Sequence, residues 1–165
     1  MNSNANGLYR QTLMLKMLIA SVLMLIWAAG CSSAPSVTPE KFVLNFIQKH
    51  IPMIDLSVAD FYVKEEQAGI IERVQASIAS NKAKGIFGSL SATTYDFSKI
   101  KVDVLDQKEQ YVDDEEVNFL KVAATGNYTK TANGKIESLI EDKIIIIESV
   151  AGAWKVTENI NPWKS

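Results

Sequence analysis

The hydrophobic pattern divides the chain into three stretches of different period. Residues 17–27 form one uninterrupted apolar run, MLIASVLMLIW. From Thr38 to about Ala83 the apolar residues recur at helical spacing, and from Ser98 onward they alternate with polar residues, as in strands with one solvated face. Helices followed by strands predict an α+β domain, in which N-terminal helices pack on a curved antiparallel sheet.

Three helices are expected in the helical stretch. Residues 38–40, Thr-Pro-Glu, combine a capping hydroxyl, a proline at the first helical position and an acidic first turn, and Pro52 ends this helix near His50. A second helical segment is expected over 56–62 and a third over 64–83. Their apolar positions are Phe42, Val43, Phe46 and Ile47 in the first helix and Ile70, Ile71, Val74 and Ile78 in the third.

The alternating stretch predicts four strands. The first begins at Ser98, and the others cover 117–131, 135–150 and 153–159. The charged run QKEQYVDDEE over 107–116 is interpreted as a connection. Asn133-Gly134 and Ala151-Gly152 are interpreted as the turns that separate the last three strands.

Two irregularities break the alternation. The phase slips at Phe119-Leu120, which predicts a β-bulge that bends the sheet. Four consecutive isoleucines over 144–147 place two on each face of their strand, so both faces must be covered. Helices cover one face, and the outer face needs another part of the chain or a second copy. A homodimer through the outer face of the sheet is therefore a hypothesis.

The apolar run near the N-terminus has the length of a signal-peptide core. A membrane-spanning helix needs about 20 apolar residues, and this run is shorter. Arg10 and Lys16 precede it and are the only charged residues in 1–30. Met14 is an alternative start, because the segment after it is a complete, shorter signal.

The residues Ala28-Ala29-Gly30-Cys31 follow the run and resemble the lipobox of bacterial lipoproteins, with Ala28 where that family most often has leucine. The resemblance implies cleavage between Gly30 and Cys31, acylation of Cys31 including palmitate, and a membrane anchor in the cell envelope. Ser32 and Ser33 resemble the sorting class for the outer membrane, facing the periplasm, if the organism has two membranes.

This assignment divides the chain into a lipoprotein signal peptide over 1–30, a lipidated N-terminus and flexible tether over 31–37, and a single α+β domain over 38–165. The tether sequence SSAPSV is small, polar and contains proline, as in flexible linkers. A total length of 165 residues leaves room for one ordinary domain.

Composition excludes several function classes. The chain has 17 Lys and Arg, 19 Asp and Glu and a net charge of −2 without a basic cluster, so nucleic acid is not an expected partner. A single cysteine excludes an internal disulfide. No phosphate loop, catalytic triad or metal-binding motif can be assembled, and we expect no cofactor, metal or catalytic residue.

Three segments carry a second resemblance: TPEKFVLNFIQ at 38–48, DLSVADFYV at 55–63 and GAWKV at 152–156. With the order of elements, they resemble the nuclear-transport-factor-two-like, or cystatin-like, superfamily, and more closely its small lipoproteins of uncharacterised function. The resemblance implies a cone-shaped fold. Enzymes of that superfamily, ketosteroid isomerase and scytalone dehydratase among them, place an acid or base and a Tyr or His inside the cone.

Function is left open among three alternatives. The only histidine, His50, is interpreted as capping carbonyls or complementing the helix dipole. The leading hypothesis is therefore a non-catalytic binding or scaffolding module that is anchored by its lipid and contacts an envelope protein partner. The second is a lipoprotein that binds a small apolar ligand or lipid, and the third a cone-fold isomerase or lyase. The candidate pocket for the second comprises Phe46, Tyr62, Phe119, Tyr128 and Trp154.

Replacement of the lipidated cysteine tests the anchor. Cys31→Ser removes the only thiol that can carry the lipid, so we expect an uncleaved precursor without acyl chains. Mass spectrometry of the protein from membranes measures both properties. Normal maturation of this variant would contradict the lipoprotein assignment.

Overall fold

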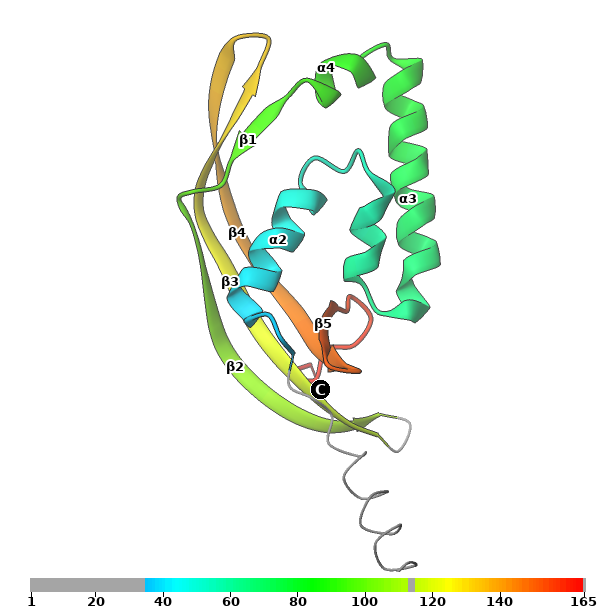
Figure 1. The fold of residues 1–165 in the computed structure, drawn as a ribbon, viewed down its shortest axis with the longest axis vertical. Helices are drawn as coiled ribbons and strands as arrows, with labels where there is room; N and C mark the ends of the chain where they lie inside the picture. Colours follow the sequence, from blue (N-terminus) through cyan, green and yellow to red (C-terminus); the bar gives the residue numbers. More distant parts are fainter. Residues whose placement is uncertain (1–34, 113–114, 165) are drawn as a thin grey trace, which may run out of the picture. The chain divides into compact units, whose positions relative to one another are not determined.

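The computed structural model describes residues 35–112 and 115–164. The predictions for the signal peptide, Cys31 and the start at Met14 lie outside these residues. The described residues form three α-helices and one 3₁₀-helix followed by an open antiparallel sheet of five strands (Figure 1). The α+β class is therefore confirmed.

Helix α2 (Pro39–His50) has the predicted bounds. The Thr38 hydroxyl caps it by accepting a hydrogen bond from the Lys41 amide at 3.4 Å, and Pro39 occupies the first turn. Its buried side chains Val43, Phe46 and Ile47 lie on one face. The apolar stripe read from the sequence is thus the face that packs on the sheet.

The next two helices were expected, and one element after them was not. The segment η1 (Leu56–Phe61) is a 3₁₀-helix, capped by the Asp55 carboxylate, and α3 spans Lys64–Ala83. Ile70 is buried on α3, whereas the neighbouring Ile71 is exposed. The buried face of α3 is therefore narrower than predicted. The short helix α4 (Phe87–Ser91) was missed. No described helix has the length and apolarity to cross a membrane.

The sheet is built around its longest strand, β3 (Glu115–Ala132). On one edge β3 pairs with both β1 (Thr94–Asp96) and β2 (Ile100–Val112), and on the other with β4 (Lys135–Val150). Strand β5 (Ala153–Val156) pairs with the last part of β4. Helix α2 packs directly against the concave face of this curved sheet, and η1 and α3 lie on the same side (Figure 1).

The charged run over 107–116 is not a connection, and this prediction was wrong. Its described residues extend β2 and open β3, so the two strands form one long hairpin. Charged side chains are compatible with strands here because both faces of the hairpin are solvated and residues 107–111 are exposed.

A β-bulge was predicted at Phe119-Leu120, but the irregularity of the sheet lies in β2 instead. The register between β2 and β3 shifts between Val104 and Asp106, which leaves Leu105 as an extra residue. Strand β3 runs through Phe119-Leu120 without interruption. The hydrophobic alternation of β3 only appears to slip here, because two consecutive residues are buried on opposite faces. Leu120 faces the core and Phe119 is buried on the other face.

The C-terminal segment covers part of the outer face. The last strand was predicted to reach residue 159 but ends at Val156. From this edge the chain crosses to β2, where the Trp163 indole donates to Asp106 at 2.8 Å and Lys108 donates to the Pro162 carbonyl. Another part of the chain therefore supplies part of the cover that the sequence demanded for this face.

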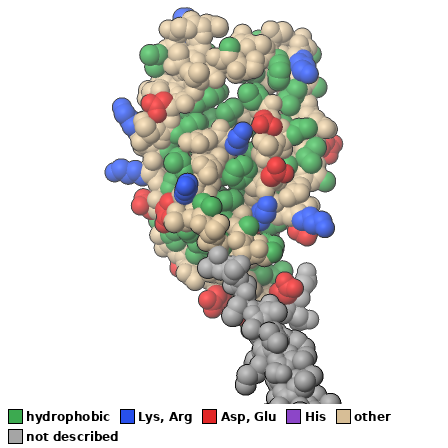
Figure 2. Space-filling view, in the orientation of Figure 1, with side chains coloured by type: hydrophobic (Ala, Val, Ile, Leu, Met, Phe, Trp, Pro, Cys, Tyr) green, Lys and Arg blue, Asp and Glu red, His purple; other side chains and the backbone are tan. Residues whose placement is uncertain are grey.

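Charges do not gather into a patch on the face drawn in Figure 2, where Lys, Arg, Asp and Glu side chains are scattered among apolar ones. This distribution agrees with the absence of a basic cluster in the sequence.

Gly126 allows β1 and β2 to share one edge of β3. Its backbone has φ +128°, and an added Cβ would collide with the Lys99 carbonyl in the connection between β1 and β2. Residues with a side chain rarely adopt this conformation. The glycine is therefore required where the chain passes from one strand to the other.

We expect Gly126→Ala to lower the free energy of unfolding by about 2 kcal/mol or more, because it combines backbone strain with the collision. Urea unfolding followed by circular dichroism measures the change. Gly88→Ala is the matched control, since nothing lies near its added Cβ and its φ is ordinary. Equal effects of the two substitutions would contradict this role of Gly126.

Candidate functional site

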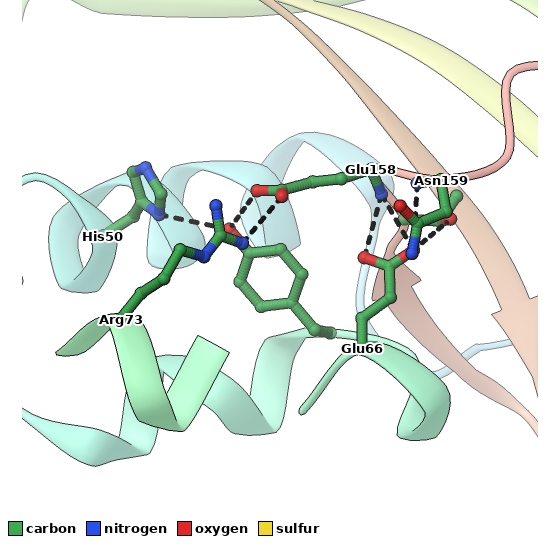
Figure 3. Close-up of polar contacts among 7 residues, drawn as sticks. His50, Glu66, Arg73, Glu158 and Asn159 are labelled. Atoms are coloured by element: carbon green, nitrogen blue, oxygen red, sulfur yellow. Dashed lines mark hydrogen bonds and ion pairs between the residues drawn. The ribbon is translucent and has the colours of Figure 1, made fainter. Parts of the chain in front are cut away.

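A polar network lies where α2, η1, α3 and the C-terminal segment meet (Figure 3). The Tyr62 hydroxyl, at the end of η1, lies 3.1 Å from Glu158 Oε1 and 3.3 Å from His50 Nδ1. The hydroxyl has one hydrogen, which it donates to the carboxylate, so Nδ1 of His50 donates to the hydroxyl oxygen. Tyr62 is 1% exposed, which makes this the enclosed end of the network.

The other end of the network is solvated. Arg73, on α3, donates to Glu158 Oε2 at 2.7 Å, and both side chains are about half exposed. Glu158 thus bridges a buried phenol and a surface guanidinium. Because the ion pair is solvated, its own contribution to stability is small.

Burial sets the pKa of both titratable groups at the enclosed end. Burial lowers the pKa of His50 below 6.5, Lys143 and Arg73 lower it further, and Glu158 opposes the shift. Burial also raises the pKa of Tyr62, with Glu158 adding to it. Nδ1 of His50 bonds to Tyr62, and the lowered pKa disfavours the charged form that the predicted interaction with the helix dipole needs.

A second carboxylate, Glu66, holds the C-terminal segment directly. It accepts the Thr157 hydroxyl at 2.8 Å, the Glu158 amide at 2.9 Å and the Asn159 amide at 3.0 Å (Figure 3). Glu66 lies in the first turn of α3 and is buried. We call Glu66 and the three residues that it binds, 157–159, the C-terminal latch.

A third carboxylate, Glu148, is buried on β4. Its burial raises its pKa above the ordinary value, and the nearby Glu65 and Glu66 raise it further. Glu148 thus places a second acidic group near Glu66, and repulsion between the carboxylates opposes ionisation of Glu148.

The network contains the groups of a proton relay, but its geometry is that of a structural support. A tyrosine, a neutral histidine and a carboxylate in a chain can exchange protons. Here each of them already bonds to another, and the phenol is enclosed. Within residues 35–112 and 115–164 no group of three His, Cys, Asp or Glu side chains is placed to hold a metal ion.

An open groove of about 460 Å³ lies between α2, the connection that follows it and η1. Both apolar and polar side chains line it: Asn45, Gln48, Lys49, Pro52, Ile54, Asp55 and Phe61. Lys49 and Asp55 form an exposed ion pair at 3.4 Å within this lining. None of the residues predicted for the pocket belongs to it.

The predicted pocket residues do not surround one space. Phe46 and Tyr62 pack edge to face, with ring centroids 5.6 Å apart, and both are buried. Phe119 lies on the outer side of β3, opposite the helices. Tyr128 stacks on Phe97 at 5.2 Å in another part of the sheet.

The fifth predicted pocket residue, Trp154 on β5, holds the end of the tether. Its indole donates to the Val37 carbonyl at 2.9 Å. The side chain is partly buried and packs against the core. The hydrogen bond from the indole nitrogen thus fixes the chain just before α2.

Sequence reasoning missed the carboxylates and the arginine of the network. One signal was present: Glu66, Ile70 and Val74 recur at intervals of four, so Glu66 lies on the buried stripe of α3. A carboxylate on such a stripe needs donors from elsewhere in the fold. Nothing in the sequence pointed to Glu158 as one of the residues that supply them.

Comparisons with protein-family models, with curated proteins and with solved structures found no match.

We expect Glu66→Gln to lower the free energy of unfolding by about 2–3 kcal/mol, because an amide replaces a charged acceptor of several hydrogen bonds. The matched control is Glu65→Gln, the exposed neighbour in the same turn, which should change stability little. Urea unfolding compares the two. Equal free energies of unfolding for the two variants would contradict a stabilising role of the latch.

Proposed function

We propose that the protein is a lipid-anchored lipoprotein of the bacterial cell envelope whose domain is a non-catalytic binding module for an envelope protein. The lipobox resemblance at Ala28–Cys31 supports the anchor. The helices on a curved antiparallel sheet are compatible with the cone-shaped, cystatin-like superfamily that the sequence resembles. Placement in the outer membrane, facing the periplasm, rests on Ser32 and Ser33.

The tether would hold the domain near the membrane. Trp154 binds the Val37 carbonyl, so six residue steps separate the proposed lipid on Cys31 from this contact. Six residue steps extend over about 20 Å at most. A domain on so short a tether reaches partners in or close to the same membrane, which favours a binding module in the envelope.

The observation that carries the proposal is the burial of the side chains that the alternatives require. A small apolar ligand needs an open pocket, but Phe46, Tyr62 and Phe119 are almost fully buried and do not share one cavity. The groove beside α2 has the volume of a small-molecule site and a mostly apolar lining, but it is open to solvent and carries the exposed Lys49–Asp55 ion pair. A protein surface fits such an open groove better than a lipid does.

The enzyme alternative has one observation in its favour. His50, Tyr62 and Glu158 form the kind of chain that acid–base catalysis uses. A catalytic group must touch the substrate, however, and the Tyr62 side chain is enclosed. We therefore assign these residues to positioning the C-terminal segment.

Native mass spectrometry of residues 32–165, purified from the encoding organism without the lipid, tests this function. We expect masses of polypeptide alone, because Phe46, Tyr62 and Phe119, which were expected to line a pocket, are buried instead. A small molecule retained in stoichiometric amount would contradict the proposal.

Two variants assign such a molecule to one of the alternatives. Loss of it in Tyr62→Phe would favour the isomerase or lyase, since only the phenol oxygen is removed. Loss of it in Gln48→Trp, which fills the groove from an exposed position, would favour the ligand-binding lipoprotein. Circular dichroism of both variants confirms that each remains folded.

A further inference from the structure

Most of β4 has one unpaired edge among the described strands. Strand β5 pairs only with Ile147 to Val150, and the Thr157 amide binds the carbonyl of Ile146. Residues 135–145 are paired with β3 on one side and with no described strand on the other. Long unpaired edges are rare in stable proteins, because their free amides and carbonyls bind other strands.

Hairpin geometry shows which backbone groups face this edge. Val150 and Ala153 flank a two-residue turn, and Ala132 and Lys135 flank another. Residues next to such turns bond to each other, so odd residues of β4 bond to β3 and even residues face away. The bond from Thr157 to Ile146 agrees with this alternation. The amides and carbonyls of even residues 136–144 therefore point to the free edge.

The same even residues carry the most exposed isoleucines of the sheet. The exposed fractions are 73% for Ile136, 79% for Ile140 and 51% for Ile144. All three point to the outer face, opposite the core residues Ile145 and Ile147. An apolar row beside an unpaired edge is typical of a strand that pairs with another strand.

We infer that two copies of this chain pair through residues 135–145 of β4, antiparallel, with Ile140 opposite Ile140 of the other copy. The free edge has its midpoint at Ile140, so this register uses its whole length. It also places Ile136 opposite Ile144. The dimer continues the sheet from one copy into the other.

The charges fit the same register. Glu137 of one copy lies opposite Lys143 of the other, and the two-fold axis repeats the pair. Both side chains are more than half exposed, although each also has an oppositely charged neighbour in its own chain, Lys130 and Glu141. Directly opposed unlike charges stabilise a pair of strands, and like charges destabilise it. Ser138 lies opposite Asp142, so no like charges meet.

This pairing differs from a dimer formed face to face through the outer side of the sheet. Part of that face is already covered by the C-terminal segment. Edge pairing leaves the segment in place and brings the exposed isoleucines of both copies into one row. It requires neither the lipid anchor nor the proposed binding function.

Cysteine cross-linking tests the register in residues 32–165, which lack Cys31. Residues directly opposite in a hydrogen-bonded antiparallel pair have Cα atoms about 5.5 Å apart, within reach of a disulfide. We expect Ile140→Cys to form a covalent dimer under mild oxidation. Ile136→Cys alone and Ile144→Cys alone should remain monomers on denaturing gels, whereas a mixture of these two variants should form the dimer.

Sedimentation at micromolar concentration gives the second readout. We expect the wild-type domain to show twice the monomer mass. Ile140→Lys, which places two ammonium groups at the axis, should restore the monomer without loss of secondary structure. Ile86→Lys is the control, because Ile86 is also exposed but precedes α4 and is not part of β4.

Two results would overturn the inference. One is a wild-type monomer at every concentration with no disulfide in Ile140→Cys. The other is a dimer that persists in Ile140→Lys and is cross-linked by Lys121→Cys, which would indicate face-to-face stacking through the middle of the outer face.

Discussion

The carboxylate of Glu66 is the contact on which the arrangement of helices, sheet and C-terminal segment depends. It accepts hydrogen bonds from three consecutive residues, 157–159, just after β5 ends. These bonds direct the chain away from the sheet edge and bring Glu158 within reach of Tyr62 and Arg73. A buried anion with several donors is strongly stabilised, whereas the same anion without them would be costly. The network around His50 is therefore a consequence of the latch.

Much of the fold is determined by local signals in the sequence. The Thr38-Pro39 cap, Pro52 and the two hairpin turns act over a few residues, and α2, α3 and β4 have bounds close to those expected. The predictions fail where contacts between residues distant in the sequence determine the structure. The described residues of the run over 107–116 form strands because β3 pairs with β2, and the last strand ends at Val156 because Glu66 binds residues 157–159. Short elements such as α4 and β1 have too few residues to show a period.

The candidate site was less predictable than the fold. Phe46 and Tyr62 were expected to lie together, and they do, but as part of the core. Phe119 and Tyr128 lie in other parts of the sheet because alternate residues of a strand face opposite ways and because β3 is long. The partners of Tyr62 and Glu66 are distant in sequence, and periodicity carries no information about such pairs. His50 was expected to cap carbonyls or complement the helix dipole, and its bond to Tyr62 was not foreseen.

The distance along the chain between the two sides of the latch affects when the fold can be completed. Glu66 and Glu158 are 92 positions apart, so the loop between them closes late and at a high entropic cost. A ribosome must have synthesised the chain beyond residue 159 before this closure can occur. A chain that waits for these residues therefore keeps the surroundings of Tyr62 open until its synthesis is nearly complete.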